Sequence, residues 1–317
     1  MSNLINFIIM PDFNPTGQIT PDKTITQPQV LPDTLNSNVE TDIESGTKGL
    51  TAEELKDPNE IKVTISDHDA PIVILYGPPS CGKTMTLVCL TRFLKSHGYT
   101  VQPERGFRPS ADTHYKSICE NFNEMVNSDD AATSTNNISF MLVKVYNTQG
   151  RCLCQILEAP GEYYFTKDNP KAEYPTYFHE IADSDTRKVW AIIVEPDWED
   201  QEDRVNYVDR IHKLKSRICP RDKVVFVYNK IDCTNFVISP GIVNTSEAIK
   251  KVSQDYPGLF SKFENTHPIT RFLRKYDCGF IPFQTGNYTP TVGGKLRFTK
   301  ANDAYARNLW NEIKKQI

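Results

Sequence analysis

The sequence lacks the marks of a membrane-spanning, secreted or zinc-binding protein. No apolar run approaches the roughly 20 residues that a helix needs to cross a bilayer. The apolar opening, Met1–Met10, has no basic region and no small-residue cleavage site, so we expect it to dock on a partner or fray rather than to serve as a signal peptide. The 8 cysteines include no C-x-x-C pair, which favours reduced thiols in a cytoplasmic protein.

The sequence also lacks a large excess of charge of one sign. Lys and Arg number 36 and Asp and Glu number 40, which gives a net charge of −4. This balance argues against a surface that coats nucleic acid, and we expect no nucleic-acid partner. What the sequence does have is 38% hydrophobic residues over 317 positions, enough to bury the core of one large domain or two small ones.

The first 50 residues differ in composition from the rest. They are rich in Pro, Thr, Asn, Asp and Gln, and too poor in aromatic residues to bury the area that would offset the entropy of ordering them. We expect residues 1–50 to form a flexible or partner-binding arm and residues 51–317 to form one domain. Thr51–Glu54 has the form of a capping box and predicts a helix start. The alternation of Ile61, Val63 and Ile65 predicts a strand with one buried face.

From Pro71 onward, predicted strands and helices alternate, which is typical of a largely parallel sheet covered by helices on both faces. Apolar runs predict strands over residues 72–76, 138–146, 152–157, 189–195, 223–228 and 278–283. Only Asn147–Gly150 joins the second of these to the third, so the two must form an antiparallel hairpin. We therefore predict a three-layer α/β fold with a mostly parallel six-stranded sheet and one antiparallel edge hairpin strand.

Apolar residues at helical spacing predict helices over residues 84–94, 115–125, 205–218 and 305–313. The second of these helices falls in a long insertion at about residues 100–137. A further insertion, at about residues 233–277, contains several aromatic residues that are more typical of a core than of an interface.

The segment Gly77–Thr84 matches G-x-x-x-x-G-K-[ST] and lies between a predicted buried strand and a predicted helix, which is the setting of a P-loop. Its glycines allow the backbone N–H groups to turn inward, where the start of the helix adds positive potential for phosphate oxygens. Lys83 is predicted to reach the β- and γ-phosphates and to be catalytic, and the Thr84 hydroxyl to bind Mg²⁺. The predicted phosphate-binding residues are Gly77, Pro78, Pro79, Ser80, Cys81, Gly82, Lys83, Thr84 and Met85.

The segment Asn229–Asp232 directly follows an apolar strand and resembles the base-reading motif of GTPases. That resemblance implies that Asp232 accepts hydrogen bonds from the guanine ring N–H and amine, while Asn229 and Lys230 shape the base pocket. Adenine lacks these donors, so a buried carboxylate would stay unpaired against ATP at a cost of a few kcal/mol. A later strand-end segment, Phe283–Gly286, is similar to the second guanine-contacting loop, which makes Thr285 and Gly286 nucleotide-binding candidates.

The segment Glu158–Glu162 resembles the D-x-x-G segment of GTPases, with Gly161 implied to meet the γ-phosphate and Glu158 to hold Mg²⁺ through water. Glu158 stands where the family has aspartate. Glu162 stands where Ras-like enzymes have the glutamine that orients the attacking water, so it is a candidate base, a group that repels the γ-phosphate, or a surface carboxylate. For the switch threonine that binds Mg²⁺ we favour Thr135, with Thr133 and Thr113 as alternatives.

Together these segments resemble a GTPase of the TRAFAC class, which includes Ras-like G-domains, over about residues 70–317. The Gly-Pro-Pro of the P-loop and the Pro-Gly-Glu of the later segment are similar to bacterial GTPases of the double-GTPase type. The resemblance implies a P-loop NTPase fold, GTP or GDP as ligand and Mg²⁺ as cofactor. It also implies a protein partner, such as an activator, exchange factor or effector, that binds the switch regions or the N-terminal arm.

Three functions follow in decreasing order of preference. The first is a conformational switch that hydrolyses GTP, with Arg105 or Arg108 as candidate arginine fingers supplied by the chain itself. The second is a guanine-nucleotide-binding scaffold with little or no hydrolysis, suggested by the carboxylates at Glu158 and Glu162. The third is a nucleotide or small-molecule kinase, which would leave the Asn229–Asp232 segment unexplained.

Overall fold

The computed structural model of the chain describes residues 50–128, 140–196, 198, 200–269, 271, 275–290 and 296–317. Its centre is a seven-stranded sheet in the order β2-β3-β4-β1-β5-β6-β9. The strands are β1 (Ile72–Tyr76), β2 (Thr100–Pro103), β3 (Met141–Tyr146), β4 (Cys152–Glu158), β5 (Lys188–Val194), β6 (Lys223–Tyr228) and β9 (Gly279–Pro282). Strands β4, β1, β5, β6 and β9 run parallel, whereas β3 is antiparallel to both of its neighbours.

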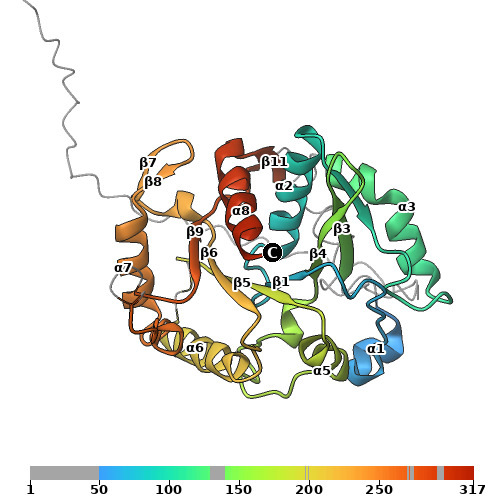
Figure 1. Cartoon of the computed structure of the whole chain (residues 1–317), viewed down its shortest axis with the longest axis horizontal. Helices are drawn as coiled ribbons and strands as arrows, with labels where there is room; N and C mark the ends of the chain where they lie inside the picture. The colour runs from blue at the N-terminus through green and yellow to red at the C-terminus, as the bar shows by residue number, and fades with distance from the viewer. Residues whose placement is uncertain are drawn as a thin grey trace, which may run out of the picture. The chain divides into compact units, whose positions relative to one another are not determined.

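Helices cover both faces of this sheet (Figure 1). Helices α2 (Lys83–Ser96) and α8 (Asp303–Gln316) lie on one face, and α5 (Thr176–Asp183) and α6 (Gln201–Lys215) lie on the other. The predicted three-layer, mostly parallel α/β fold is confirmed. All five residues of β1 are buried, each large apolar side chain being worth about 1.5–3 kcal/mol on burial.

Two details of the predicted sheet are wrong. The sheet has seven strands rather than six, because the short segment Thr100–Pro103 pairs with β3 and takes the edge position that was assigned to the hairpin. Only Val101 of that strand is buried, so it leaves little hydrophobic pattern in the sequence. The strand predicted from Ile61 to Ile65 does not form, although Ile61 is buried and the backbone N–H of Thr64 donates to Phe107 O over 2.8 Å.

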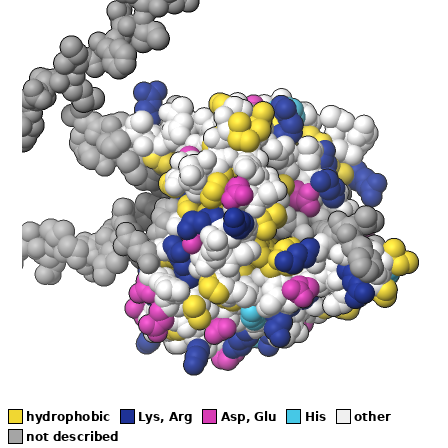
Figure 2. All heavy atoms as spheres, turned by 90° about the vertical axis from the view of Figure 1, so that its left-hand side faces the viewer, with side chains coloured by type: hydrophobic (Ala, Val, Ile, Leu, Met, Phe, Trp, Pro, Cys, Tyr) yellow, Lys and Arg dark blue, Asp and Glu magenta, His cyan; other side chains and the backbone are white. Residues whose placement is uncertain are grey.

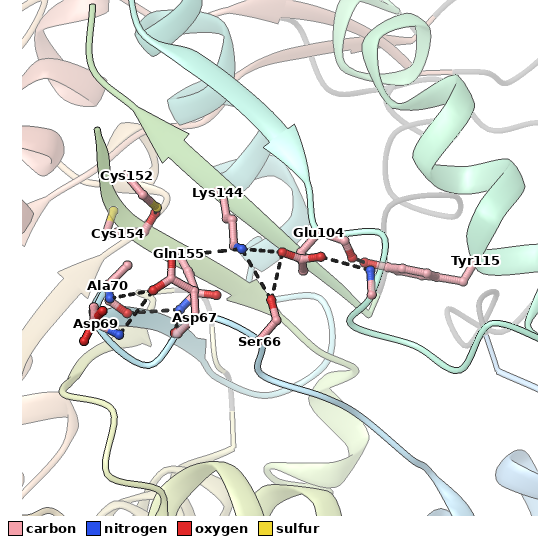
Figure 3. A network of polar contacts seen from close by, with 11 residues as sticks. Ser66, Asp67, Asp69, Ala70, Glu104, Tyr115, Lys144, Cys152, Cys154 and Gln155 are labelled. Carbon is pink, nitrogen blue, oxygen red and sulfur yellow. Dashed lines mark hydrogen bonds and ion pairs between the residues drawn. The ribbon is translucent and has the colours of Figure 1, made fainter. Parts of the chain in front are cut away.

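Polar contacts fasten this extended segment across β3 and β4 (Figure 3). The Lys144 ammonium lies 2.5 Å from Glu104 Oε2, to which the Ser66 hydroxyl also donates over 3.1 Å. Gln155 Nε2 donates to Asp67 O over 2.8 Å. The alternation of apolar residues therefore reflects a chain that packs on the core without joining the sheet.

The other helices lie around this frame. They are α1 (Ala52–Lys56), α3 (Thr113–Asn127) and α7 (Thr245–Asp255), with single 3-10 turns at η1 (Pro58–Glu60), η2 (Gly161–Tyr163), η3 (Ile231–Cys233) and η4 (Ser261–Phe263). The capping box predicted at Thr51 is present at the start of α1. The apolar stripe predicted for α3 is buried, from Tyr115 to Met125.

Two small hairpins were not predicted. One pairs β7 (Val237–Ser239) with β8 (Ile242–Val243), and the other pairs β10 (Gly286–Pro290) with β11 (Leu296–Lys300). On the face of the molecule seen in Figure 2, side chains of both charge signs are interspersed with hydrophobic ones. None of the helices in the described part of the chain has the length and apolar character that spanning a membrane requires.

Candidate nucleotide-binding site

The parallel strands bring five loops to one edge of the sheet, because their carboxyl ends all point the same way. The loop after β1 is the predicted P-loop. Within it, Ser80 and Gly82 adopt positive φ angles of 62° and 91°. Glycine adopts such an angle freely, whereas for a serine it costs about 1 kcal/mol or more and is typical of functional loops. The loop leads directly into α2, which is the arrangement in which backbone N–H groups and the start of a helix can together bind an anion.

The Lys83 side chain folds back over this loop. It is buried, and its Nζ donates to Gly77 O over 3.1 Å and to Pro78 O over 2.9 Å. Both partners are carbonyls of the loop itself, so these hydrogen bonds hold the ammonium against the loop. A phosphate oxygen that reaches the loop meets this charge.

The Thr84 hydroxyl meets a buried carboxylate at the end of β4. Thr84 Oγ1 donates to Glu158 Oε1 over 3.0 Å, and the backbone N–H of Phe140 donates to Glu158 Oε2 over 2.9 Å. Burial raises the pKa of Glu158 to about 7, although the Lys83 charge and these two hydrogen bonds oppose the rise. A hydroxyl and a carboxylate in contact are hard oxygen donors of the kind that Mg²⁺ prefers, so these residues fit that ion.

Gly161 packs directly against the P-loop. An added Cβ at this position would lie 2.3 Å from Pro79 N and 2.5 Å from Lys83 Nζ, far inside van der Waals contact. Only glycine allows the backbone of the segment Pro160–Glu162 to approach the P-loop so closely. The resemblance implied a contact between this glycine and the γ-phosphate, and the structure has the glycine beside the lysine that is predicted to bind the same group.

The loop after β6 is joined to the P-loop by Asn229. This side chain is 1% exposed, and its Nδ2 donates to Cys81 O over 2.9 Å. An added Cβ at Gly82 would lie 2.3 Å from the same nitrogen. The P-loop and the predicted base loop are therefore one packed unit, in which movement of either loop disturbs the other.

Lys230 adopts a left-handed conformation with φ of 53°, which turns the chain sharply after Asn229. Its ammonium lies 2.7 Å from Glu195 Oε2, an ion pair with a mostly buried carboxylate. Glu195 directly follows β5 and was not predicted as a site residue. The signal that could have identified it is an acidic residue at the carboxyl end of a predicted buried strand.

A cavity of about 360 Å³ brings together the predicted base residues and part of the predicted phosphate residues, but Gly77, Pro78, Pro79 and Cys81 do not line it. Its lining consists of Ser80, Gly82, Lys83, Thr84, Met85, Asn229, Lys230, Asp232, Cys233, Thr285, Gly286 and Tyr288. Two of these residues, Cys233 and Tyr288, were not predicted. Tyr288 lies in the β10–β11 hairpin, and the sequence has no pattern that ties this hairpin to the P-loop.

A larger cavity, of about 800 Å³, lies elsewhere, between the β7–β8 hairpin, β9 and α8. It is lined by none of the predicted site residues. We assign the site to the smaller cavity because size alone says nothing of chemistry, whereas the smaller cavity joins the predicted phosphate loop to the predicted base loop.

Several predicted residues lie outside the smaller cavity. Glu158 and Gly161 touch Thr84 and Lys83, respectively, without lining it. Glu162 is half-buried beside Gly161 and does not line it either. Thr135 and Thr133 lie outside the described residues. The remaining alternative, Thr113, is the first residue of α3.

Arg108 is not placed as an arginine finger. Its guanidinium is buried, lies 2.6 Å from Glu54 and 3.1 Å from Asp112, and donates to Lys62 O over 3.0 Å. These contacts fasten α1 to the start of α3, so Arg108 is a structural residue. Arg105, the other candidate, is exposed.

No protein-family model and no curated protein matches the chain. Among solved structures, it is similar to a Plasmodium falciparum protein described as nucleolar GTP-binding protein 1, with 14% identity and a TM-score of 0.37 over 80% of this chain and 90% of that one. It is also similar to GDP-bound aIF5B from Aeropyrum pernix, with 15% identity and a TM-score of 0.32 over 68% of this chain and 33% of that one.

Proposed function

We propose that this protein binds GTP and GDP and hydrolyses GTP with the help of Mg²⁺. One observation carries the proposal: a single cavity is lined by both the P-loop, with Lys83 and Thr84, and the loop that ends at Asp232. A P-loop alone would serve any nucleoside triphosphate. Its union with an acidic base loop, packed together through Asn229, favours guanine.

The roles of the residues follow from their positions. The backbone N–H groups of Ser80–Thr84 bind phosphate oxygens, and Lys83 leaves its carbonyl partners to neutralise them. Asp232 accepts hydrogen bonds from the guanine N–H groups, and Thr285–Gly286 lines the same pocket. Gly161 contacts the γ-phosphate, and the neighbouring Glu162 orients the attacking water.

Thr84 and Glu158 are the residues that would hold Mg²⁺. When bound, the ion would offset negative charge on the phosphate oxygens. A cation beside Glu158 favours its ionised form, which would counter the effect of burial on its pKa. Thr84 would turn its hydroxyl hydrogen away from Glu158 to offer a lone pair instead.

The decisive experiment measures phosphate release from GTP under multiple turnover, with the full chain and Mg²⁺. We expect Lys83→Ala and Thr84→Ala to abolish release, and Asp232→Asn to weaken GTP binding at least about a hundredfold because the amide offers a donor where guanine also has donors. Activity that survives Lys83→Ala, or tighter binding of ATP than of GTP, would overturn the assignment.

The second candidate is a guanine-nucleotide-binding scaffold with little or no hydrolysis. The close contact of Gly161 with Pro79 and Lys83 favours it, because a triphosphate must displace this segment before its last phosphate can lie beside Lys83. Protein that keeps GTP intact over hours with Mg²⁺ present would establish this candidate in place of the first. In either case, protein partners would bind the switch regions or the N-terminal arm.

A further inference from the structure

Tyr288 is the one aromatic side chain that lines the proposed nucleotide cavity within the described residues. It belongs to β10, which begins at Gly286 immediately after the predicted base-contacting loop. In the β10–β11 hairpin, Tyr288 pairs with Phe298 and Gly286 pairs with Lys300. The hairpin therefore extends the base loop and returns the chain beside it.

Several contacts fix the ring of Tyr288. Its hydroxyl shares a 2.9 Å hydrogen bond with Thr285 Oγ1, and its ring centroid lies 5.6 Å from that of Phe298. Phe298 is itself buried and lies under the guanidinium of Arg92 on α2, 5.1 Å from its ring centroid. Since α2 begins in the P-loop, the aromatic pair is anchored on the element that positions the phosphate site.

The two strands of this hairpin can pack against each other at Gly286 only because that residue has no side chain. An added Cβ there would be 2.3 Å from Phe298 Cε2 and 2.5 Å from Thr299 O. The rings of Tyr288 and Phe298 are tilted by 50° to each other, and Tyr288 is 39% exposed, which leaves apolar ring surface on the cavity.

Tyr288 and Asp232 act on one another electrostatically. Burial raises the pKa of Tyr288 to about 12, and the negative charge of Asp232 adds to the rise while Lys230 opposes it. The ring also lines the same cavity as the residue that is predicted to read the base edge. An acidic group for the edge of a base and an aromatic group beside it are complementary to a planar heterocycle.

We propose that Tyr288 is a base-binding residue whose ring stacks on the purine held by Asp232. This role rests on the proposed function, since it assumes that the cavity binds guanine nucleotides. Stacking on an aromatic side chain does not depend on the exocyclic groups of the base, because every purine has the same π-face. Tyr288 therefore supplies affinity, and Asp232 supplies the choice of base.

Calorimetric titration of the full chain, freed of nucleotide, with GDP and with IDP tests this division. IDP lacks the exocyclic amine of guanine, so the ratio of its affinity to that of GDP reports on Asp232. We expect Tyr288→Ala to weaken the binding of both nucleotides by about tenfold and to leave their ratio unchanged. Tyr288→Phe keeps the ring and should bind GDP within about threefold of the wild type.

Two further variants separate stacking from damage to the hairpin. Thr289→Ala changes the next residue of the same strand, which points to the other face, and it should bind GDP like the wild type. Tyr288→Trp should keep the affinity, and its added indole fluorescence should fall when GDP binds, which a purely structural role would not produce.

The possible failures are distinguishable. A wild-type chain that binds neither GDP nor IDP would overturn the proposed function and the role of Tyr288 with it. A wild-type chain that binds GDP, together with Tyr288→Ala that binds equally well, would overturn the role of Tyr288 alone. Equal losses in Tyr288→Phe and Tyr288→Ala would also overturn it, because the hydroxyl contact with Thr285 would then account for the effect.

Discussion

Replacing Asn229 by aspartate changes the contact between the base loop and the P-loop without changing the shape of the side chain. Asn229 Nδ2 donates to Cys81 O over 2.9 Å in a site where the side chain is 1% exposed. In Asn229→Asp an oxygen takes the place of this donor, so two acceptors face each other. The other oxygen of the new carboxylate takes the place of Asn229 Oδ1. That atom is buried and accepts no hydrogen bond from the described residues, so the other oxygen gains no hydrogen bond there either.

The size of the effect follows from these contacts. Losing a hydrogen bond costs about 1 kcal/mol, and leaving a buried acceptor unpaired costs about 1–3 kcal/mol more. We expect the free energy of unfolding to fall by about 2–4 kcal/mol in Asn229→Asp. If about 2 kcal/mol of this appears in binding, the affinity for GDP falls roughly thirtyfold. Asn229→Ala removes the donor without adding a charge and should cost about half as much.

A pH titration of GDP affinity gives the sharpest measurement. Burial raises the pKa of the new carboxyl in Asn229→Asp, and its protonated form can donate to Cys81 O as the amide did. A group with a raised pKa in the folded state stabilises it at low pH and loses this effect as the pH rises. Asn229→Asp should therefore regain affinity between pH 8 and pH 5.5, relative to Asn229→Ala. Equal pH profiles of GDP affinity for Asn229→Asp and Asn229→Ala, or wild-type affinity of Asn229→Asp at pH 8, would refute the proposed coupling between the two loops.

Three further predictions concern stability. Gly161→Ala introduces a Cβ that overlaps the P-loop, so urea unfolding should show a loss of about 1–3 kcal/mol, and an unchanged midpoint would contradict the packing. Arg108→Met leaves the mostly buried carboxylates of Glu54 and Asp112 without their counter-charge and should lower the free energy of unfolding by about 3 kcal/mol or more, whereas Arg105→Met, at an exposed position, should change it very little. Burial alone would raise the pKa of Glu104, but its hydrogen bonds and the charge of Lys144 outweigh burial and lower that pKa. This carboxylate therefore stabilises the fold at a pH above its ordinary pKa and loses that effect as the pH falls. Glu104→Gln should thus lower the free energy of unfolding by about 1 kcal/mol or less at pH 7 and have no effect near pH 3, and an equal loss at both would exclude this cause.

The features that the sequence predicted well are those that a single segment determines. The run Ile72–Tyr76 is apolar throughout because β1 is covered on both faces, and this alone places it in the centre of the sheet. The four residues Asn147–Gly150 are too short for a crossover, so they determine the antiparallel pairing of β3 with β4. The helical stripe of α3 is equally local.

The features that the sequence missed depend on contacts between distant segments. Ile61 and its neighbours alternate like a strand because they pack on β3 and β4, and nothing local distinguishes this from pairing. Arg108 is tied to Glu54, 54 positions away in the sequence, so its structural role could not be separated from that of a catalytic arginine. Tyr288 reaches the cavity only through the β10–β11 hairpin, whose Phe298 lies under Arg92 of the distant helix α2.

The segment after Gly161 bears on how far the proposed GTP hydrolysis could act as a conformational switch. Tyr164 stacks on Tyr76 of β1 with 4.7 Å between ring centroids, and Tyr164 O accepts a 2.6 Å hydrogen bond from Arg210 Nε. Phe165 packs on Tyr207 of α6 at 5.3 Å. Extracting two buried aromatic side chains costs about 3–6 kcal/mol, comparable to the roughly 5.5 kcal/mol that a ligand must supply to invert a two-state equilibrium.

A γ-phosphate that displaces Gly161 therefore moves a segment that is held fast from Tyr164 onward. The movement that these contacts leave open is confined to Pro160–Tyr163, the turn η2 with the proline before it. Arg210→Met would release the backbone of Tyr164 and lengthen the segment that can move. If the contacts of Tyr164 limit the displacement of Gly161, this variant should bind GTP more tightly relative to GDP than the wild type does. An unchanged ratio of the GTP and GDP affinities would show that the displacement ends before Tyr164.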